Sequence, residues 1–252
     1  MNFSKKVFLS LSLSMLFACS VTSTSPTTSS SSKQNSATSA SSTSLSASSS
    51  GLNSIVVITG WSSAAKAVHA YCPYDSTQKT LACSEKTYKT VKIGAQIWMA
   101  ENLSYTDVAA SYCYNSVAAS CSKYGALYNW TTAQAVCPAG WHLPDTSEWS
   151  SLAAAVGGAR VAGAMLKAQD SSWVRGTKAN PNPNSFGFSA LPSGYYSYSK
   201  GAYYDLGIQG YWWSASTANV NQSFSVSVGV DSTLSTLANP VASAFSVRCV
   251  KD

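Results

Sequence analysis

The residues of this chain that could carry out chemistry lie close together in one stretch, CPAGWHLPDTSEW, at residues 137–149. Cys137 and His142 are the residue types of a nucleophile and of the base that activates it. Asp145 and Glu148 are the types of a general acid and a general base. A cysteine, a histidine and carboxylates at short spacing are also the ligand types of a metal site.

A structural interpretation explains the same stretch better, and we favour it. A cysteine held in a disulfide is not a thiolate nucleophile. Asp145 stands where a helix N-cap is expected and Glu148 follows three residues later, which is the spacing of a capping box. We expect His142 to satisfy a backbone hydrogen bond in a turn. The other carboxylates have no metal-ligand spacing, so the sequence predicts no catalytic residue, no metal site and no cofactor.

Two helices are predicted to hold this stretch. The first follows Asn129, which can act as its N-cap, and ends at Pro138 and Gly140, so Cys137 lies near its buried face. The second begins at the capping box and carries an apolar stripe that starts at Trp149.

Strands are predicted on both sides of the helices. Residues 88–103 alternate around a central turn, which indicates strand, turn and strand. Residues 223–230 and 243–252 alternate again, whereas residues 111–125 form a loop pinned by two cysteines and residues 160–173 hold a short helical turn. Two helices followed by several strands predict an α+β fold with short antiparallel sheets and long loops.

The first 18 residues have the pattern of a secretory signal peptide. Two lysines precede a short apolar run, and LFAC at residues 16–19 resembles a bacterial lipobox. This resemblance implies cleavage before Cys19, lipidation of Cys19 and anchoring in a membrane. Ser20 after the cysteine implies sorting to the outer membrane. The alternative is an ordinary signal peptide, with Cys19 as a chance residue.

The rest of the chain divides into three parts. Residues 19–53 form a flexible linker, since 22 of the 31 residues from 20 to 50 are Ser or Thr and offer little apolar surface to bury. Residues 54–87 form an N-terminal extension with a disulfide-closed hairpin, and residues 88–252 form the main domain. The formal net charge of +6 becomes +4 without the two signal-peptide lysines (6 − 2), which is too mild to predict nucleic-acid binding.

Six cysteines lie beyond the predicted lipidation site. An exported chain meets an oxidising environment, so six cysteines predict three disulfides out of fifteen possible pairings. We expect the first four cysteines to pair with their nearest neighbours, which leaves the last two for each other. The expected pairs are Cys72–Cys83, Cys113–Cys121 and Cys137–Cys249.

Tyrosines crowd a Gly-, Ser- and Lys-containing segment that has few aliphatic partners. Their rigid rings bind sugars or proteins at low entropic cost. The alternative is that they pack into a minor core. The candidates for ligand binding are Tyr196, Tyr198, Tyr203 and Tyr204. By contrast, we expect Trp212 and Trp213 in the core.

Seven motifs, in this order, resemble the Fibrobacter succinogenes major paralogous domain (FISUMP) family over residues 88–252. They are YKTVKIGAQIWMAENLSY, KYGALYNWTTA, CPAGWHLPDTSEW, MLKA, SFGFSALPSGYY, GYWWSAS and SVRCVKD. This resemblance implies a fold and a location more than a reaction.

A second, distant resemblance is to C-type lectin-like domains. It rests on the pattern Ala133, Cys137, Gly140, His142, Leu143 and Glu148. It implies a C-type-lectin-like fold, stapled by a disulfide from the first helix to the last strand, with binding carried by long loops. YWWSAS lacks the acidic pair of calcium-dependent sugar-binding lectins, so calcium-dependent sugar binding is not expected.

The sequence therefore predicts a lipoprotein displayed at the outer-membrane surface of the cell envelope. We expect a non-enzymatic binding or adhesion domain whose ligand is a plant-type polysaccharide. One alternative is a structural or protein-binding envelope component without a carbohydrate ligand. A second alternative is an enzyme of the formylglycine-generating branch, which depends on free cysteines.

Overall fold

The computed structural model describes residues 72–83, 86–174 and 184–252, which all belong to one compact unit. The predicted signal peptide, the lipidation site at Cys19, the linker and residues 54–71 of the extension lie outside the described residues. Within the described ranges no helix is long and apolar enough to cross a membrane.

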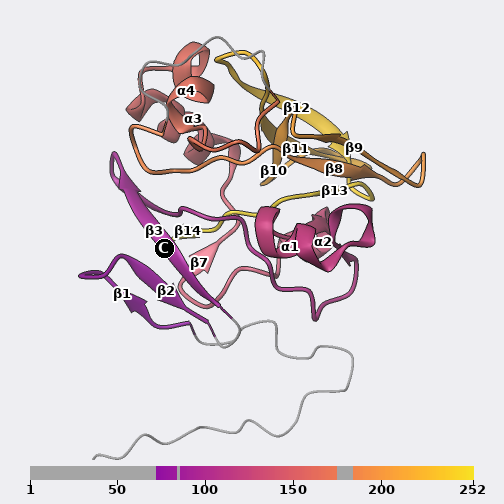
Figure 1. The fold of residues 1–252 in the computed structure, drawn as a ribbon, viewed down its shortest axis with the longest axis horizontal. Coiled ribbons are helices and arrows are strands. Elements are labelled where there is room, and N and C mark those ends of the chain that lie inside the picture. Colours follow the sequence, from indigo (N-terminus) through magenta and orange to yellow (C-terminus); the bar gives the residue numbers. More distant parts are fainter. Residues whose placement is uncertain (1–71, 84–85, 175–183) are drawn as a thin grey trace, which may run out of the picture. The chain divides into compact units, whose positions relative to one another are not determined.

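The fold is α+β and is stapled by three disulfides (Figure 1). The disulfides join Cys72 to Cys83, Cys113 to Cys121 and Cys137 to Cys249. The helices in the described ranges are α1 (Ala118–Tyr124), α2 (Trp130–Ala133), α3 (Thr146–Ala155) and α4 (Ala159–Leu166), with a 3₁₀ turn at Tyr114–Ser116.

The first sheet has six strands in the order β1-β2-β3-β4-β14-β7, and all its pairings are antiparallel. The β3–β4 pair is the predicted strand, turn and strand. The strands are β1 (Tyr74–Asp75), β2 (Thr80–Ala82), β3 (Thr87–Ile93), β4 (Gln96–Met99), β7 (Trp141–His142) and β14 (Val250–Lys251).

The second sheet has eight strands and curls into a half-barrel. Its order is β12-β11-β10-β8-β13-β6-β5, and β9 pairs with β8 beside this path. The strands are β5 (Ser111–Tyr112), β6 (Leu127–Asn129), β8 (Ser193–Ser197), β9 (Ala202–Leu206), β10 (Gly210–Asn219), β11 (Gln222–Val228), β12 (Leu234–Pro240) and β13 (Ala244–Phe245).

The segment from β13 to β14, residues 244–251, is the seam between the two sheets. On one side, the Ser246 N–H donates to the Tyr211 carbonyl of β10, and the Ser246 carbonyl accepts from the Trp213 N–H. On the other side, the Val247 carbonyl accepts from the Leu103 N–H, and the Cys249 carbonyl accepts from the Met99 N–H. The sequence pattern predicts a single strand here. The structure has two short strands instead, because the chain leaves one sheet and enters the other.

Two main apolar clusters lie on either side of this seam. One surrounds the Cys137–Cys249 disulfide and includes Trp213 and Phe245. The other is aromatic, with Trp98, Trp149, Phe188 and Trp212 in contact through ring centroids 4.8–6.4 Å apart. Trp212 and Trp213 are both fully buried, which confirms their expected place in the core.

Arg248 lies in the seam and is fully buried. Its Nε donates to Asn102 Oδ1 at 2.8 Å, and its two terminal nitrogens donate to the carbonyl groups of Phe188 and Ser189. The guanidinium carbon lies 4.2 Å from the centroid of the Phe188 ring. Burial lowers the pKa of Arg248 to about 9, and the charge of Glu101 opposes this shift.

Asn102 links this arginine to the rest of the core. Its Oδ1 also accepts a hydrogen bond from Trp212 Nε1 at 2.8 Å, and its Nδ2 donates to the Tyr124 carbonyl at 2.8 Å. Gly125 packs against it so closely that a Cβ at position 125 would lie 2.5 Å from the Asn102 Cβ. The tight packing and the shared acceptor fix the position of the Arg248 head group.

The helices differ from the sequence-based expectation in three places. The capping box and α3 are confirmed. The first predicted helix is shorter than expected, since α2 ends at Ala133. Beyond it the Ala135 N–H donates to the Thr132 carbonyl in a tighter turn, and the chain then runs to the disulfide at Cys137. The expected loop at 111–125 contains α1, whose small residues give no apolar stripe. The expected short turn after Gly158 is the two-turn helix α4.

Replacing Arg248 by Met is expected to lower the free energy of unfolding by about 2–4 kcal/mol. The buried carbonyl group of Phe188 and the partly buried one of Ser189 would lose their donors, at up to about 1–3 kcal/mol each, while removal of the buried charge offsets part of the loss. Urea unfolding followed by tryptophan fluorescence measures the change. Arg160→Met on the exposed side of α4 is the matched control and should change it by less than about 0.5 kcal/mol. Equal values for the two variants would contradict this role.

Candidate functional site

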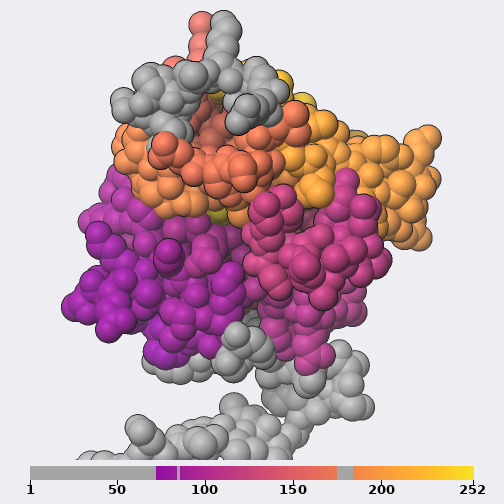
Figure 2. Space-filling view, viewed as in Figure 1, coloured from indigo at the N-terminus to yellow at the C-terminus, as the bar shows by residue number. Residues whose placement is uncertain are grey.

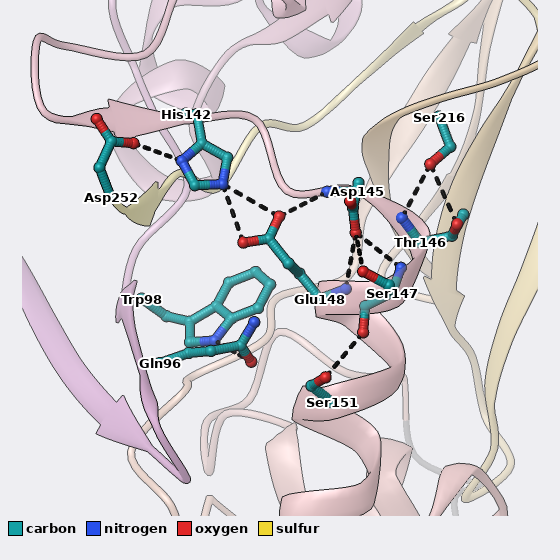
Figure 3. A network of polar contacts seen from close by, with 10 residues as sticks. All are labelled: Gln96, Trp98, His142, Asp145, Thr146, Ser147, Glu148, Ser151, Ser216 and Asp252. Carbon is teal, nitrogen blue, oxygen red and sulfur yellow. Dashed lines mark hydrogen bonds and ion pairs between the residues drawn. The ribbon is translucent and has the colours of Figure 1, made fainter.

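The stretch with the residue types of a catalytic site, residues 137–149, contributes to a compact polar cluster around His142 (Figure 3). Nδ1 of His142 lies 2.5 Å from an Asp252 carboxylate oxygen, next to the last strand. Nε2 lies 2.9 and 3.1 Å from the two oxygens of Glu148, in the first turn of α3. His142 therefore bridges the end of the first sheet and the start of a helix. The prediction that the His142 side chain bonds a backbone group was wrong, because both ring nitrogens face carboxylates.

Glu148 has two roles in this cluster. Its Oε2 accepts the backbone N–H of Asp145 at 2.9 Å, which completes the capping box, while both of its oxygens face His142. Asp145 accepts the backbone N–H groups of Ser147 and Glu148 in return. Hydrogen bonds, first from the Ser147 hydroxyl and then from the Glu148 amide, lower the pKa of Asp145.

The pKa of His142 is set by opposing effects. Burial lowers it, but the hydrogen bonds to Asp252 and Glu148 and the charges of the two carboxylates raise it more, so the net shift is upward from 6.5. The imidazolium form is thus favoured by the folded state. About two fifths of the side chain stays accessible to water, which weakens each ion pair.

This cluster is poorly arranged for covalent or metal chemistry. Cys137 is bonded to Cys249, so its sulfur is not a thiolate. Both His142 nitrogens already face carboxylates. The two carboxylates lie on opposite sides of the ring, so one ion cannot bind both of them and a ring nitrogen. In the parts of the chain that the structure describes, no group of three or more His, Cys, Asp and Glu side chains could hold a metal ion.

The candidate tyrosines lie on the hairpin formed by β8 and β9. Figure 2 shows this hairpin, in orange, standing out from the edge of the face in view. Its register pairs Tyr196 with Tyr203 and Tyr195 with Tyr204. Because directly paired residues share a face of a sheet, the four candidate tyrosines do not form one surface.

The first face of the hairpin carries Tyr196 and Tyr203. Tyr196 stacks on Tyr112 with ring centroids 4.9 Å apart, and Tyr203 packs against Tyr114 at 5.1 Å. Burial, followed by the nearby hydroxyls of Tyr196, Tyr203 and Tyr198, raises the pKa of Tyr112. Tyr198, at the hairpin turn, is 65% exposed and so adds an open ring beside this group.

The second face carries Tyr204, which is 39% exposed. It stacks on Tyr195 at 5.6 Å, and Tyr195 in turn packs against Tyr211 at 5.1 Å. The Tyr211 hydroxyl donates to Asp205 Oδ2 at 2.7 Å. Burial and then this hydrogen bond raise the pKa of Tyr211, so the carboxylate of the hairpin is already engaged.

Sequence reasoning did not find Tyr112 and Tyr114 as neighbours of the hairpin. They flank Cys113, and the Cys113–Cys121 disulfide together with the β5–β6 pairing brings them to it. The only indication in the sequence was that both tyrosines flank a cysteine. More than 70 residues separate them from the hairpin, so the sequence pattern could not predict the contact.

The Fibrobacter succinogenes major domain family model matches residues 91–251, more than half of the chain. A search of curated proteins and a search of solved structures each find no match.

The pKa shift of His142 predicts a pH-dependent contribution to stability. A raised pKa in the folded state means that the contribution is fully present below about pH 6.5 and is lost as pH rises through the folded pKa. We expect the stability advantage of the unmodified protein over His142→Asn, measured by urea unfolding, to be larger at pH 5.5 than at pH 9.

A nuclear magnetic resonance titration of the His142 ring provides the direct check. Asp252→Asn should lower its pKa, whereas Asp75→Asn, at the end of β1, should leave it unchanged. A His142 pKa below 6.5 in the unmodified protein would overturn the assignment.

Proposed function

Because this chain belongs to the Fibrobacter succinogenes major domain family, we propose that it is a non-enzymatic binding or adhesion protein of the cell surface, with a plant-type polysaccharide as its ligand. The β8–β9 hairpin is the binding element. The observation that carries this proposal is the exposure of Tyr198 and Tyr204 on a hairpin whose other tyrosines are stacked.

The stacking makes the hairpin suitable for recognition. Rings held by neighbours lose little conformational entropy when a ligand binds, and Tyr196 and Tyr203 are held in this way by Tyr112 and Tyr114. An exposed ring such as Tyr198 offers an apolar surface and a hydroxyl to the same ligand. These are the contacts that a sugar ring, with its apolar face and polar rim, requires.

The charges on the hairpin favour a neutral ligand. Asp205 is engaged by Tyr211, and Lys200 at the exposed turn is the remaining charged side chain of residues 193–206. Without a free carboxylate on this element, binding through it does not need calcium. We therefore expect stacking and hydroxyl hydrogen bonds to dominate over ion pairing.

The location follows from the N-terminal sequence. A signal peptide at residues 1–18, lipidation of Cys19 and a Ser/Thr-rich linker would anchor the domain in the outer membrane and hold it away from the surface. The hairpin could then reach a ligand outside the cell. Partners in this proposal are the membrane and a polysaccharide or an envelope protein, without nucleic acid or a cofactor.

We also propose that the domain is a distant C-type-lectin-like fold. The Cys137–Cys249 disulfide supports this, since it links the segment after α2 to the residue before the last strand. The long segment between α4 and β10, which carries the hairpin, corresponds to the loop region through which such domains bind. The disulfide and the order of the motifs are the basis of the proposal.

A structural or protein-binding component of the envelope is the second candidate. It is favoured by the same ring contacts. Tyr196 packs against both Tyr112 and Tyr203, so much of the surface of these rings is used within the domain and is not open to a sugar. An enzyme of the formylglycine-generating branch is less well supported. All six cysteines of the described residues are in disulfides.

A thiol count addresses the enzyme alternative. We expect no free thiol in the denatured mature protein before reduction and six after reduction, measured with a thiol-reactive dye. Lipidation occupies Cys19 in that protein. One reactive thiol before reduction would favour the enzyme.

Replacing Tyr198 and Tyr204 by Ala is expected to weaken polysaccharide binding at least about tenfold, which corresponds to about 1.4 kcal/mol. Retention on cellulose, xylan and mannan, followed by titration with the retained material, measures it. Tyr198 is mostly exposed and Tyr204 loses its stacking on Tyr195, so the variant should stay folded and lose at most about 1.5 kcal/mol of stability.

Tyr124→Ala, at the end of α1, is the control and should bind normally. Loss of binding in the control but not in the double variant would place the ligand elsewhere. Absence of retention on all three materials and on a glycan array would remove the polysaccharide proposal and leave the protein-binding candidate.

A further inference from the structure

Among the strands of the described residues, β12 is the outer strand of the second sheet, and none of them pairs with its outer side. It pairs with β11 through all seven of its residues, Leu234 to Pro240, without a register shift. It is the last strand in the order of its sheet, and Figure 1 shows it on the outer side of β11. The backbone groups on its far side therefore face away from the sheet.

This edge carries few of the features that normally prevent strands from joining. Edge strands are commonly protected by charged side chains, proline, bulges, short length or a covering helix. The sequence of β12, LSTLANP, has no charge, its register has no bulge, and its proline, Pro240, is the last residue, so the six residues before it keep their backbone N–H groups. Helix α4 packs near its beginning, where Leu234 is buried, but Thr236, Leu237 and Ala238 are exposed.

We propose that β12 is a dimerisation edge that pairs antiparallel with β12 of a second copy of this chain. A two-fold axis at Leu237 makes the pairing self-complementary, as a symmetric interface requires. Leu237 then lies opposite Leu237 of the second copy. In the same way, Thr236 lies opposite Ala238 and Ser235 lies opposite Asn239 of the second copy. The two sheets join into one, with continuous hydrogen bonds across the axis.

The side chains of β12 favour a second copy over a charged peptide. Leu237 is 51% exposed and lies in the middle of the strand, so the axis brings two apolar side chains together. No like charges meet at any position of the strand, because β12 has none. The remaining contacts are between small or hydroxyl side chains, which fit the close spacing of paired strands.

One edge pair buries little surface, so the dimer is weak. Interfaces below about 1,200 Å² are typical of transient association. We therefore expect a concentration-dependent equilibrium rather than an obligate dimer. The pairing does not involve the β8–β9 hairpin, so it stands independently of the proposed ligand.

Cysteine cross-linking tests the register directly. In a full-length chain carrying Cys19→Ser, Leu237→Cys places two thiols on strand positions about 4.5–5.5 Å apart between Cα atoms, within reach of a disulfide. Mild oxidation should give a covalent dimer on non-reducing gels. Ser235→Cys is the matched control, because its own copy lies about 13 Å along the strand, and it should stay mostly monomeric.

Sedimentation measures the association without cross-linking. Leu237→Lys should weaken dimerisation at least tenfold, since two ammonium groups would meet at the axis, and Val220→Lys, in the exposed β10–β11 turn, should not. A monomer at all concentrations, or equal cross-linking at positions 235 and 237, would overturn the proposal. A dimer unaffected by Leu237→Lys would also overturn it and assign the contact to another surface.

Discussion

The burial of one guanidinium group is the interaction on which the two halves of this domain depend. Among the described residues no carboxylate contacts Arg248 directly; the group is held by an amide oxygen, two backbone carbonyl groups and the face of Phe188. These acceptors come from the loop after β4 and from the chain before β8. A fully buried charge is tolerated only when its donors are satisfied, so the elements that supply the acceptors must assemble together. The aromatic cluster and the seam then take their positions around the same group.

The His142 cluster shows how residue types associated with catalysis can serve a scaffold. Each of them has a structural partner: Cys137 bonds the last segment, Asp145 and Glu148 cap α3, and His142 joins the cap to the end of the first sheet. The hairpin is organised differently. Its tyrosines use one another as support, and this leaves a few rings open on a rigid element. The scaffold cluster and the proposed binding element therefore lie in separate parts of the domain.

The sequence predicted features that depend on neighbours along the chain. The capping box at Asp145, the turn at Gly94 and the core positions of Trp212 and Trp213 all follow from local spacing. Family resemblance was confirmed over residues 91–251. One distant contact, the Cys137–Cys249 disulfide, was also predicted correctly, because pairing the first four cysteines with their neighbours leaves these two for each other. Other features that depend on distant contacts were missed. An arginine in an alternating strand looks exposed from its pattern alone, and nothing near Tyr196 in the chain indicates its stacking on Tyr112.

The position of the seam in the chain has a consequence for biogenesis. Residues 244–251 bond strands of both sheets and carry Arg248 and Cys249, and they are made after all the elements that they join. Both apolar clusters include residues of this segment, Phe245, Val247 and Cys249 in one and Val250 in the other. Neither cluster is therefore complete until residues 244–251 have been made, so a chain cut before residue 244 is expected to lack both parts of the native core.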